Sequence, residues 1–180
     1  MIIVLLLLVG LVMFVMYMRA KNRFITKTPW QHFFHGMTFS AEEFYKKVEQ
    51  TVQDWKLTGI TIDRESFLES HLFSAKREYL RITRNEFVYF IGAVPLGTGM
   101  FVSSWMCQKA VKKHSLENTP FLNKLMGKER DNKSFYQEDV DYMYRSAVHT
   151  AVLEVVDSYT NASGVRGLTD FERQLTEPKK

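Results

Sequence analysis

Two histidines near the N-terminus have a spacing that could support metal binding. His32 and His35 are three residues apart, which would place both imidazoles on one face of a helix. No cysteine or acidic residue lies within six residues of the pair, so the rest of a typical ligand set is missing. We interpret them as ordinary histidines and predict no metal site.

Nucleophilic catalysis would need Cys107, which is the one cysteine of the chain, to meet a base such as His149. The spacing does not require this meeting, and a histidine on an apolar helix is more often a core or interface residue. Ser103 and Ser104 lack the G-x-S-x-G motif of a serine nucleophile, and no phosphate-binding glycine motif occurs. We predict no catalytic residue, no cofactor and no identifiable small-molecule substrate. An enzyme with a site near His149 and Cys107 remains an alternative.

A basic set on an expected strand could contact lipid phosphates or an acidic partner. Arg77 and Arg81 are separated by an even number of residues, so they share one face of the strand with Tyr79. The alternative is that these arginines pair across strands with Asp63 and Glu65, which also share a face of their own strand.

The elements that would position these residues begin with an uncharged N-terminal segment. Residues 1–18 are almost entirely apolar and would span about 27 Å as a helix, close to the thickness of a bilayer core. A cleavable signal peptide is the competing interpretation, but small residues at its cleavage-site spacing are missing. The four cations that follow predict an N-terminus outside and a cytosolic domain. They are Arg19, Lys21, Arg23 and Lys27.

The remaining chain is expected to form a basic juxtamembrane linker (19–38), one cytosolic domain (39–175) and a short tail (176–180). Residues 71–133 carry a net charge of +6, so we predict contact with anionic lipid, including contacts from Lys112 and Lys113. Nucleic acid is not expected, because no stacking aromatic motif accompanies the charge. The single cysteine excludes an intramolecular disulfide.

Periodicity predicts an α+β fold for this domain. Helical spacing extends over residues 41–57 and 135–160, and residues between them alternate like four strands. We expect a four-stranded antiparallel meander, covered on one face by these two helices. Phe87 to Cys107 carries no charge and is read as a buried hairpin. A second membrane span, or a hairpin tip at residues 94–100 that enters the membrane surface, are the alternatives.

The long C-terminal helix suggests a function. Leu153 and Val156 lie beside its main apolar stripe, so we predict that another surface covers them, from a protein partner or a second copy. The leading interpretation is a single-pass, membrane-anchored, non-catalytic adaptor or assembly domain that contacts the lipid bilayer and a protein partner. Besides the enzyme, an accessory subunit of a membrane transport or secretion complex is an alternative.

Overall fold

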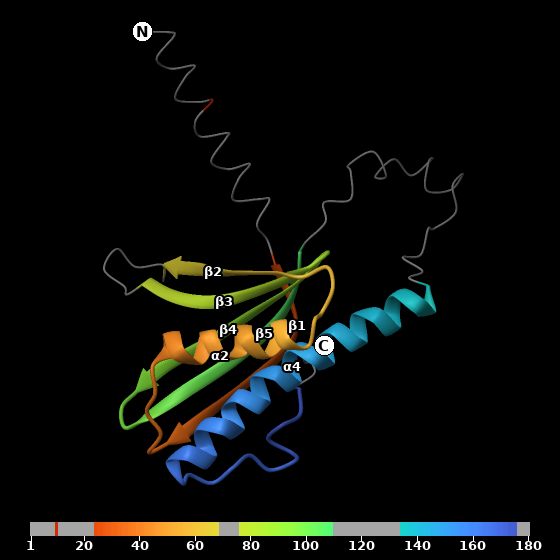
Figure 1. Ribbon diagram of the computed structural model, residues 1–180. Helices are drawn as coiled ribbons and strands as arrows, with labels where there is room; N and C mark the ends of the chain where they lie inside the picture. Colours follow the sequence, from red (N-terminus) through yellow and green to blue (C-terminus); the bar gives the residue numbers. More distant parts are fainter. Residues whose placement is uncertain (1–9, 11–23, 69–75, 110–133, 176–180) are drawn as a thin grey trace, which may run out of the picture.

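The fold has two layers, a five-stranded antiparallel sheet and two helices that lie on one of its faces (Figure 1). It is a computed structural model, which describes residues 24–68, 76–109 and 134–175 together with Gly10. The elements in chain order are β1 (Phe24–His35), α2 (Ala41–Asp54), β2 (Thr61–Leu68), β3 (Lys76–Arg84), β4 (Phe87–Leu96), β5 (Gly99–Lys109) and α4 (Phe135–Ser163). The spatial order of the strands is β1-β5-β4-β3-β2.

The predicted four-stranded sheet is wrong, because the sheet has a fifth strand. The four expected strands are β2 to β5, and β1 pairs with β5 along its length inside the segment predicted as a linker, 19–38. Two features obscure the alternation of polar and apolar residues that would have revealed β1. One is Pro29, and the other is the pair of neighbouring phenylalanines, Phe33 and Phe34. A proline is tolerated there because β1 is an edge strand and need not donate every ladder hydrogen bond.

The expected transmembrane helix, residues 1–18, lies outside the described residues except for Gly10. Of the helices that the described part of the chain forms, none is long and apolar enough to cross a membrane. The α+β class and the position of both helices on one face are as predicted. Residues 87–107 form the β4–β5 hairpin, so a second span there is excluded.

Helix α2 begins as its sequence predicts. The Ser40 hydroxyl accepts a hydrogen bond from the Glu43 amide at 3.4 Å, and the rings of Phe39 and Phe44 stack with centroids 5.3 Å apart. The helix ends at Asp54, three residues earlier than expected, and Lys56 follows in a left-handed conformation with φ 52°. This early end lets the chain turn back into β2.

Helix α4 has a complete capping box at its start. The Ser134 hydroxyl accepts from the Gln137 amide, and the Gln137 side chain accepts from the Ser134 amide at 3.1 Å. The helix ends where Gly164 adopts a left-handed φ of 62°, the usual conformation at a helix C-terminus.

The core lies between the helices and the sheet, where tyrosines join the two layers. Tyr45 of α2 donates from its hydroxyl to the Glu78 carbonyl at 2.9 Å and accepts from the Ala93 amide at 3.0 Å. Tyr144 of α4 donates to the Ile82 carbonyl at 3.0 Å. These buried hydroxyls are satisfied by backbone groups of the sheet, which fixes both helices in register with the strands.

The other face of the sheet carries a hollow lined mainly by aromatic rings, and we call it the concave face. The rings of Phe67 on β2 and Phe90 on β4 are 5.3 Å apart, although β3 lies between these strands. In a flat sheet, the backbones of strands two positions apart are about 10 Å apart, so these two side chains lean toward each other over β3. Gly92 leaves room for the Tyr79 ring on this face, because a Cβ atom there would lie 2.7 Å from that ring.

Candidate functional site

His149 lies in the packed part of α4, facing the C-terminal segment. Its Nε2 is 2.7 Å from the Arg173 carbonyl oxygen, and its ring packs edge-on against Trp30 with centroids 5.8 Å apart. Because a carbonyl only accepts hydrogen bonds, Nε2 carries the proton and donates it. Burial lowers the pKa of His149, and the hydrogen bond to Arg173 partly opposes this effect. The imidazole is therefore neutral at pH 7.

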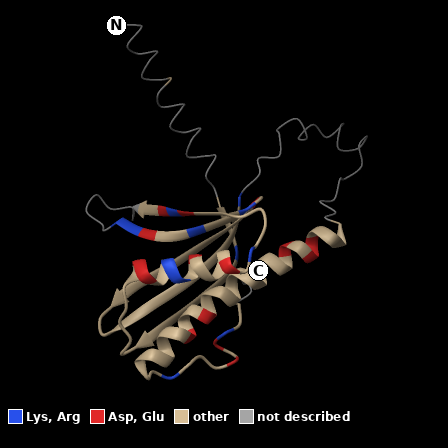
Figure 2. Cartoon of the chain, viewed as in Figure 1, with Lys and Arg blue, Asp and Glu red and all other residues tan. Residues whose placement is uncertain are grey.

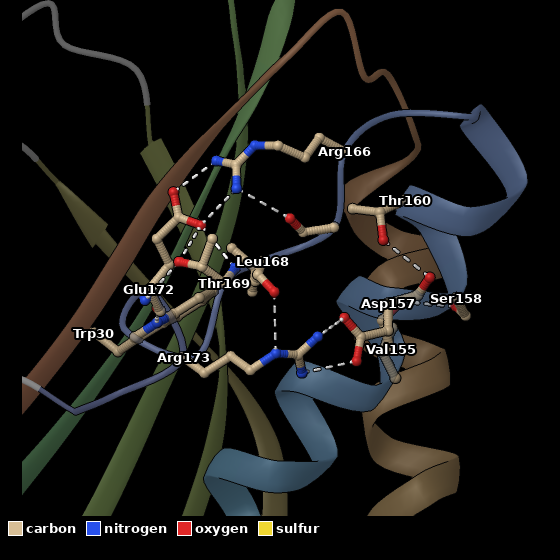
Figure 3. A network of polar contacts seen from close by, with 11 residues as sticks. Trp30, Val155, Asp157, Ser158, Thr160, Arg166, Leu168, Thr169, Glu172 and Arg173 are labelled. Atoms are coloured by element: carbon tan, nitrogen blue, oxygen red, sulfur yellow. Dashed lines mark hydrogen bonds and ion pairs between the residues drawn. The ribbon is translucent and has the colours of Figure 1, made fainter.

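Residues 165–175 form a segment that we call the C-terminal latch, and its polar contacts are drawn in Figure 3. The Trp30 indole donates to the Glu172 carbonyl at 2.7 Å. The Arg173 guanidinium makes two hydrogen bonds to the Asp157 carboxylate, at 2.7 and 2.9 Å. The latch thus connects β1 to α4, and the hydrogen bond from His149 to the Arg173 carbonyl is one of its contacts.

The Glu172 carboxylate makes hydrogen bonds within the latch. It accepts two hydrogen bonds from Arg166, at 2.7 and 3.0 Å, and one from the Thr169 amide at 2.8 Å. Hydrogen bonds from Arg166 and Thr169 lower the pKa of Glu172 to about 2, so the carboxylate is ionised throughout the physiological range. These groups hold one another in place, which gives them a structural role.

Cys107 and His149 are not brought together. Cys107 lies on the concave face of the sheet with Val88 and Phe90, whereas His149 packs with Trp30 on the helix-covered face. The sheet therefore separates the thiol from the imidazole. Burial also raises the pKa of the Cys107 thiol, which disfavours the thiolate that a nucleophile needs. This geometry does not assemble the alternative enzyme site.

His32 and His35 lie on strand β1, not on a helix. Residues three apart in a strand point to opposite faces, so these two imidazoles diverge. His32 packs on Phe34 and His35 on Phe33, with ring centroids 4.6 and 5.4 Å apart. Within the residues that the structure describes, no group of three or more potential ligands could hold a metal ion.

Arg81 is paired across strands, as the alternative interpretation proposed. Its guanidinium makes two hydrogen bonds to Asp63, at 2.6 and 2.7 Å, and a third, shorter contact to Glu65. Hydrogen bonding to Asp63 is the main cause that raises the pKa of Arg81. Two carboxylates therefore already neutralise this arginine, which weakens the case for Arg81 as a lipid contact.

The other predicted lipid contacts are partly outside the described chain. Lys27 lies in a bulge of β1 and is exposed, and Arg77 is exposed at the start of β3, opposite Phe67 in register. Five others lie outside the residues described: Arg19, Lys21, Arg23, Lys112 and Lys113.

Leu153 and Val156, the expected partner interface, lie against the body of the same chain. Val156 is fully buried in the core, and Leu153 is partly buried and packs on it. The second surface that the helix pattern requires is thus supplied by the fold itself at Val156. The argument for a partner at these two residues loses its basis.

A different part of α4 is uncovered. Residues 135–143, which we call the α4 overhang, extend past the sheet at the helix N-terminus (Figure 1). Four large apolar side chains there are 61 to 87% exposed. They are Phe135, Tyr136, Tyr142 and Met143. Acidic residues lie among them, as Figure 2 shows at this end of the helix.

A hollow lies on either side of the α4 overhang. One hollow, of about 260 Å³, separates the overhang from the β3–β4 turn at Arg84 and Asn85. The other, of about 310 Å³, lies between Tyr142 and the ends of β4 and β5, where Phe87 and Met106 line it. The overhang is therefore a ridge of apolar side chains flanked by two grooves.

A second apolar surface lies on the concave face of the sheet. We call it the open-face cluster, and its members are Phe24, Phe67, Tyr79, Val88, Phe90, Trp105 and Cys107. Edge-to-face contacts link the rings, with Phe24 5.1 Å from Phe90 and Phe67 5.6 Å from Tyr79. An open hollow of about 220 Å³ lies over this cluster, with Trp105 and Cys107 in its lining.

Sequence reasoning missed both surfaces. Part of the signal for the open-face cluster was present in the sequence. Phe67, Tyr79 and Trp105 are large aromatic residues whose neighbours two positions away, on the same strand face, are charged or small, which is unusual for a buried face. Connecting them required the order of the strands and the contacts of the rings across them. The four exposed side chains of the overhang lie on the side of α4 away from its buried stripe, and the 3.6-residue periodicity of the helix could have revealed this.

Comparisons of the chain with protein-family models, with curated proteins and with solved structures gave no match. The observations that bear on function are therefore the two surfaces and the uncharged N-terminal segment with its basic flank.

Proposed function

We propose that this protein is a membrane-attached, non-catalytic adaptor that holds a protein partner through the α4 overhang. The observation that carries the proposal is the exposure of four large apolar side chains within three helical turns, from Phe135 at 87% to Tyr142 at 61%. Aromatic residues and methionine are enriched in protein–protein interfaces, and contiguous exposed apolar surface marks binding sites. The α4 overhang fits both criteria.

The chemistry of the overhang indicates the kind of partner. Glu138 and Asp139 are exposed between the apolar side chains, and the described part of the overhang contains no cation. A matching partner would present apolar side chains flanked by lysine or arginine. Such charge complementarity contributes to orientation and to the rate of association more than to affinity.

Attachment to the membrane is the second part of the proposal. It is supported by the uncharged segment 1–18 and by the cluster of cations from Arg19 to Lys27. Cations on this flank favour the cytosolic side and attract anionic headgroups, each by about 1 kcal/mol. Residues 24–175 would then lie on the cytosolic surface, with the overhang available to a cytosolic or membrane partner.

Site-specific photocrosslinking in intact membranes tests the partner surface. A photoreactive phenylalanine analogue replaces Tyr142 in one variant of the full chain and Thr150 in the control. Thr150 is exposed on the same helix, outside the overhang. We expect a discrete protein adduct at position 142 that is absent at position 150.

The identity of the adduct separates the possible outcomes. An adduct of different mass, identified as a second protein and reproduced by a crosslinker at Met143, supports the adaptor. An adduct at twice the mass of the chain shows that the partner is a second copy. Equal adducts at 142 and 150, or lipid adducts alone, would contradict a protein-binding role for the overhang.

A further inference from the structure

We propose that the open-face cluster docks on the bilayer surface, so that the sheet rests on the lipid by its aromatic end. This inference rests on the membrane attachment proposed above and adds a second contact with the bilayer. It assigns the concave face to lipid and leaves the α4 overhang to the protein partner. The surface is centred on Phe24, Phe67 and Trp105.

The length of the connection places this surface beside the bilayer. Only residues 19–23 separate the uncharged segment from Phe24, the first residue of β1. Five residues reach at most about 18 Å when fully extended. Phe24 itself belongs to the open-face cluster and packs on Phe90. The cluster therefore starts at the point where the chain would leave the membrane.

The composition of the cluster suits the interface between lipid and water. Tryptophan and tyrosine concentrate at the headgroup level, where an apolar ring with one polar atom is favoured. Trp105 and Tyr79 are half-buried, and Phe67 remains 39% exposed although it contacts two other rings. The hollow of about 220 Å³ over these rings gives apolar lipid groups a place to enter.

Charge on this face predicts how the docking depends on lipid type. Arg81 shares the face with the cluster, and Asp63 and Glu65 already occupy its guanidinium. Lys109 is exposed opposite Phe24 in register. Arg77, opposite Phe67, and Lys109 place two exposed cations at this face. Added salt should therefore weaken attraction to anionic lipid but leave the contact of the aromatic rings with neutral lipid.

Only one end of the concave face should touch lipid. Leu96 lies on the same face of the sheet and is 60% exposed, but at the far end of β4. The length of β5, from Gly99 to Lys109, separates the two ends by about 33 Å. Leu96 is therefore a matched control for Phe67, being an exposed apolar residue on the same surface outside the tether's reach.

Tryptophan quenching by brominated lipid tests the docking on the full chain. The three tryptophans differ in position: Trp30 is 2% exposed in the core, Trp55 is 38% exposed at the end of α2, and Trp105 belongs to the cluster. The chain is reconstituted into vesicles of phosphatidylcholine, with or without bromine on the acyl chains. We expect quenching that persists in Trp55→Phe and disappears in Trp105→Phe.

Flotation of the vesicles separates the failure of docking from the failure of attachment. Chain that does not float with the vesicles would remove the membrane attachment and the docking together. Chain that floats, but whose emission is unaffected by bromine or is quenched equally in Trp105→Phe, would overturn the docking and leave the attachment intact.

Spin labels provide a second measurement that does not depend on tryptophan. In a Cys107→Ser background, one label replaces Phe67 and the control label replaces Leu96. We expect the ratio of collisions with oxygen to collisions with a water-soluble nickel chelate to be roughly tenfold higher at 67, which corresponds to about 1.4 kcal/mol in relative partition. Equal ratios at both positions would overturn the proposal. Spin–spin broadening at 67 that grows with the protein-to-lipid ratio would also overturn it, because a second copy would then cover the face.

Discussion

The two parts of helix α4 share one helix but differ in what lies beneath them. In residues 144–163, Val148, Val152 and Val156 are fully buried against the sheet and α2. In residues 135–143, Tyr136 and Met143 lie more than about 100° around the helix from Val148 and are 76 and 67% exposed. The packed part carries polar residues such as Thr150 and Glu154 on its outer side, whereas the overhang carries aromatic and methionine side chains there.

The boundary between the two parts is the β3–β4 turn. Arg84, at the end of β3, reaches the Val140 carbonyl at 3.4 Å and lies 5.9 Å from the Tyr144 ring centre. Asn85, with a φ of 52°, then reverses the chain into β4. Between this turn and its N-terminus, α4 extends past the sheet, and Phe135 and Tyr136 there are 87 and 76% exposed.

The largest expected effect contrasts a glutamate in each part of α4. Val156→Glu places an unpaired charge in a fully buried site and should lower the free energy of unfolding by at least about 4 kcal/mol. Tyr142→Glu, at a residue 61% exposed, should change it by less than about 0.5 kcal/mol. Urea denaturation of the full chain in mild detergent measures both.

The same pair decides whether the packed part is core or interface. If Val156→Glu folds normally and only dissociates an oligomer, the burial of Val156 is not what stabilises the domain. If Tyr142→Glu unfolds the chain, the overhang is covered in solution and the division of α4 fails.

The second expected effect is a pH dependence confined to the packed part. Burial lowers the pKa of His149 below its usual 6.5. Above pH 6.5 the imidazole is neutral in both states, so it adds no pH dependence. As the pH falls through 6.5, the unfolded chain gains a proton that the folded chain does not, and the free energy of unfolding decreases until the folded pKa is reached.

The slope from this one group reaches at most about 1.4 kcal/mol per pH unit. His149→Gln should flatten the dependence of stability on pH between 7 and 5, whereas His35→Gln, at an exposed histidine of β1, should not. Urea midpoints measured across this range provide the comparison. Parallel curves for wild type and His149→Gln would show that the imidazole protonates freely in the fold.

Local rules of the sequence predicted much of this fold. Two helices and four of the strands were predicted from the spacing of apolar residues, and the caps at Ser40 and Ser134 and the turn at Asn85 depend on residue types a few positions apart. Each depends on contacts within one turn or one hairpin, which sequence spacing encodes directly. The strand β1 was missed because Pro29 and Phe33 break its alternation.

The candidate surfaces could not be predicted in the same way. The open-face cluster depends on the Phe67 side chain of β2 meeting Phe90 of β4 across β3, and this contact depends on the whole sheet and not on any one segment. The burial of Val156 depends on the C-terminal part of α4 packing over the sheet. Pairing of Arg81 with Asp63 was weighed as an alternative, because residues opposite each other in two strands follow from register.

The third expected effect concerns the end of α4 in its packed part. Gly164 has a φ of 62°, and no atom lies within 4 Å of the position a Cβ would take. Gly164→Ala therefore introduces only backbone strain and should cost about 1 kcal/mol of global stability. Gly167→Ala, at a glycine without positive φ and with equal space, is the control and should have a smaller effect. Equal losses would show that the left-handed conformation is not what makes residue 164 sensitive.

The smallest global effect is expected at the start of α4, in the overhang. Ser134→Ala removes one member of the capping box, which in a packed helix costs about 1 kcal/mol. Here the first turns make few tertiary contacts, so the loss should appear as local fraying: faster amide hydrogen exchange over residues 135–143, with the urea midpoint nearly unchanged. Ser40→Ala is the matched control. Because α2 packs in the core along its length, loss of its cap should lower the urea midpoint of the whole domain. If Ser134→Ala lowers the midpoint as much as Ser40→Ala, the overhang is coupled to the folded core, and an adaptor surface that is free to bind a partner becomes untenable.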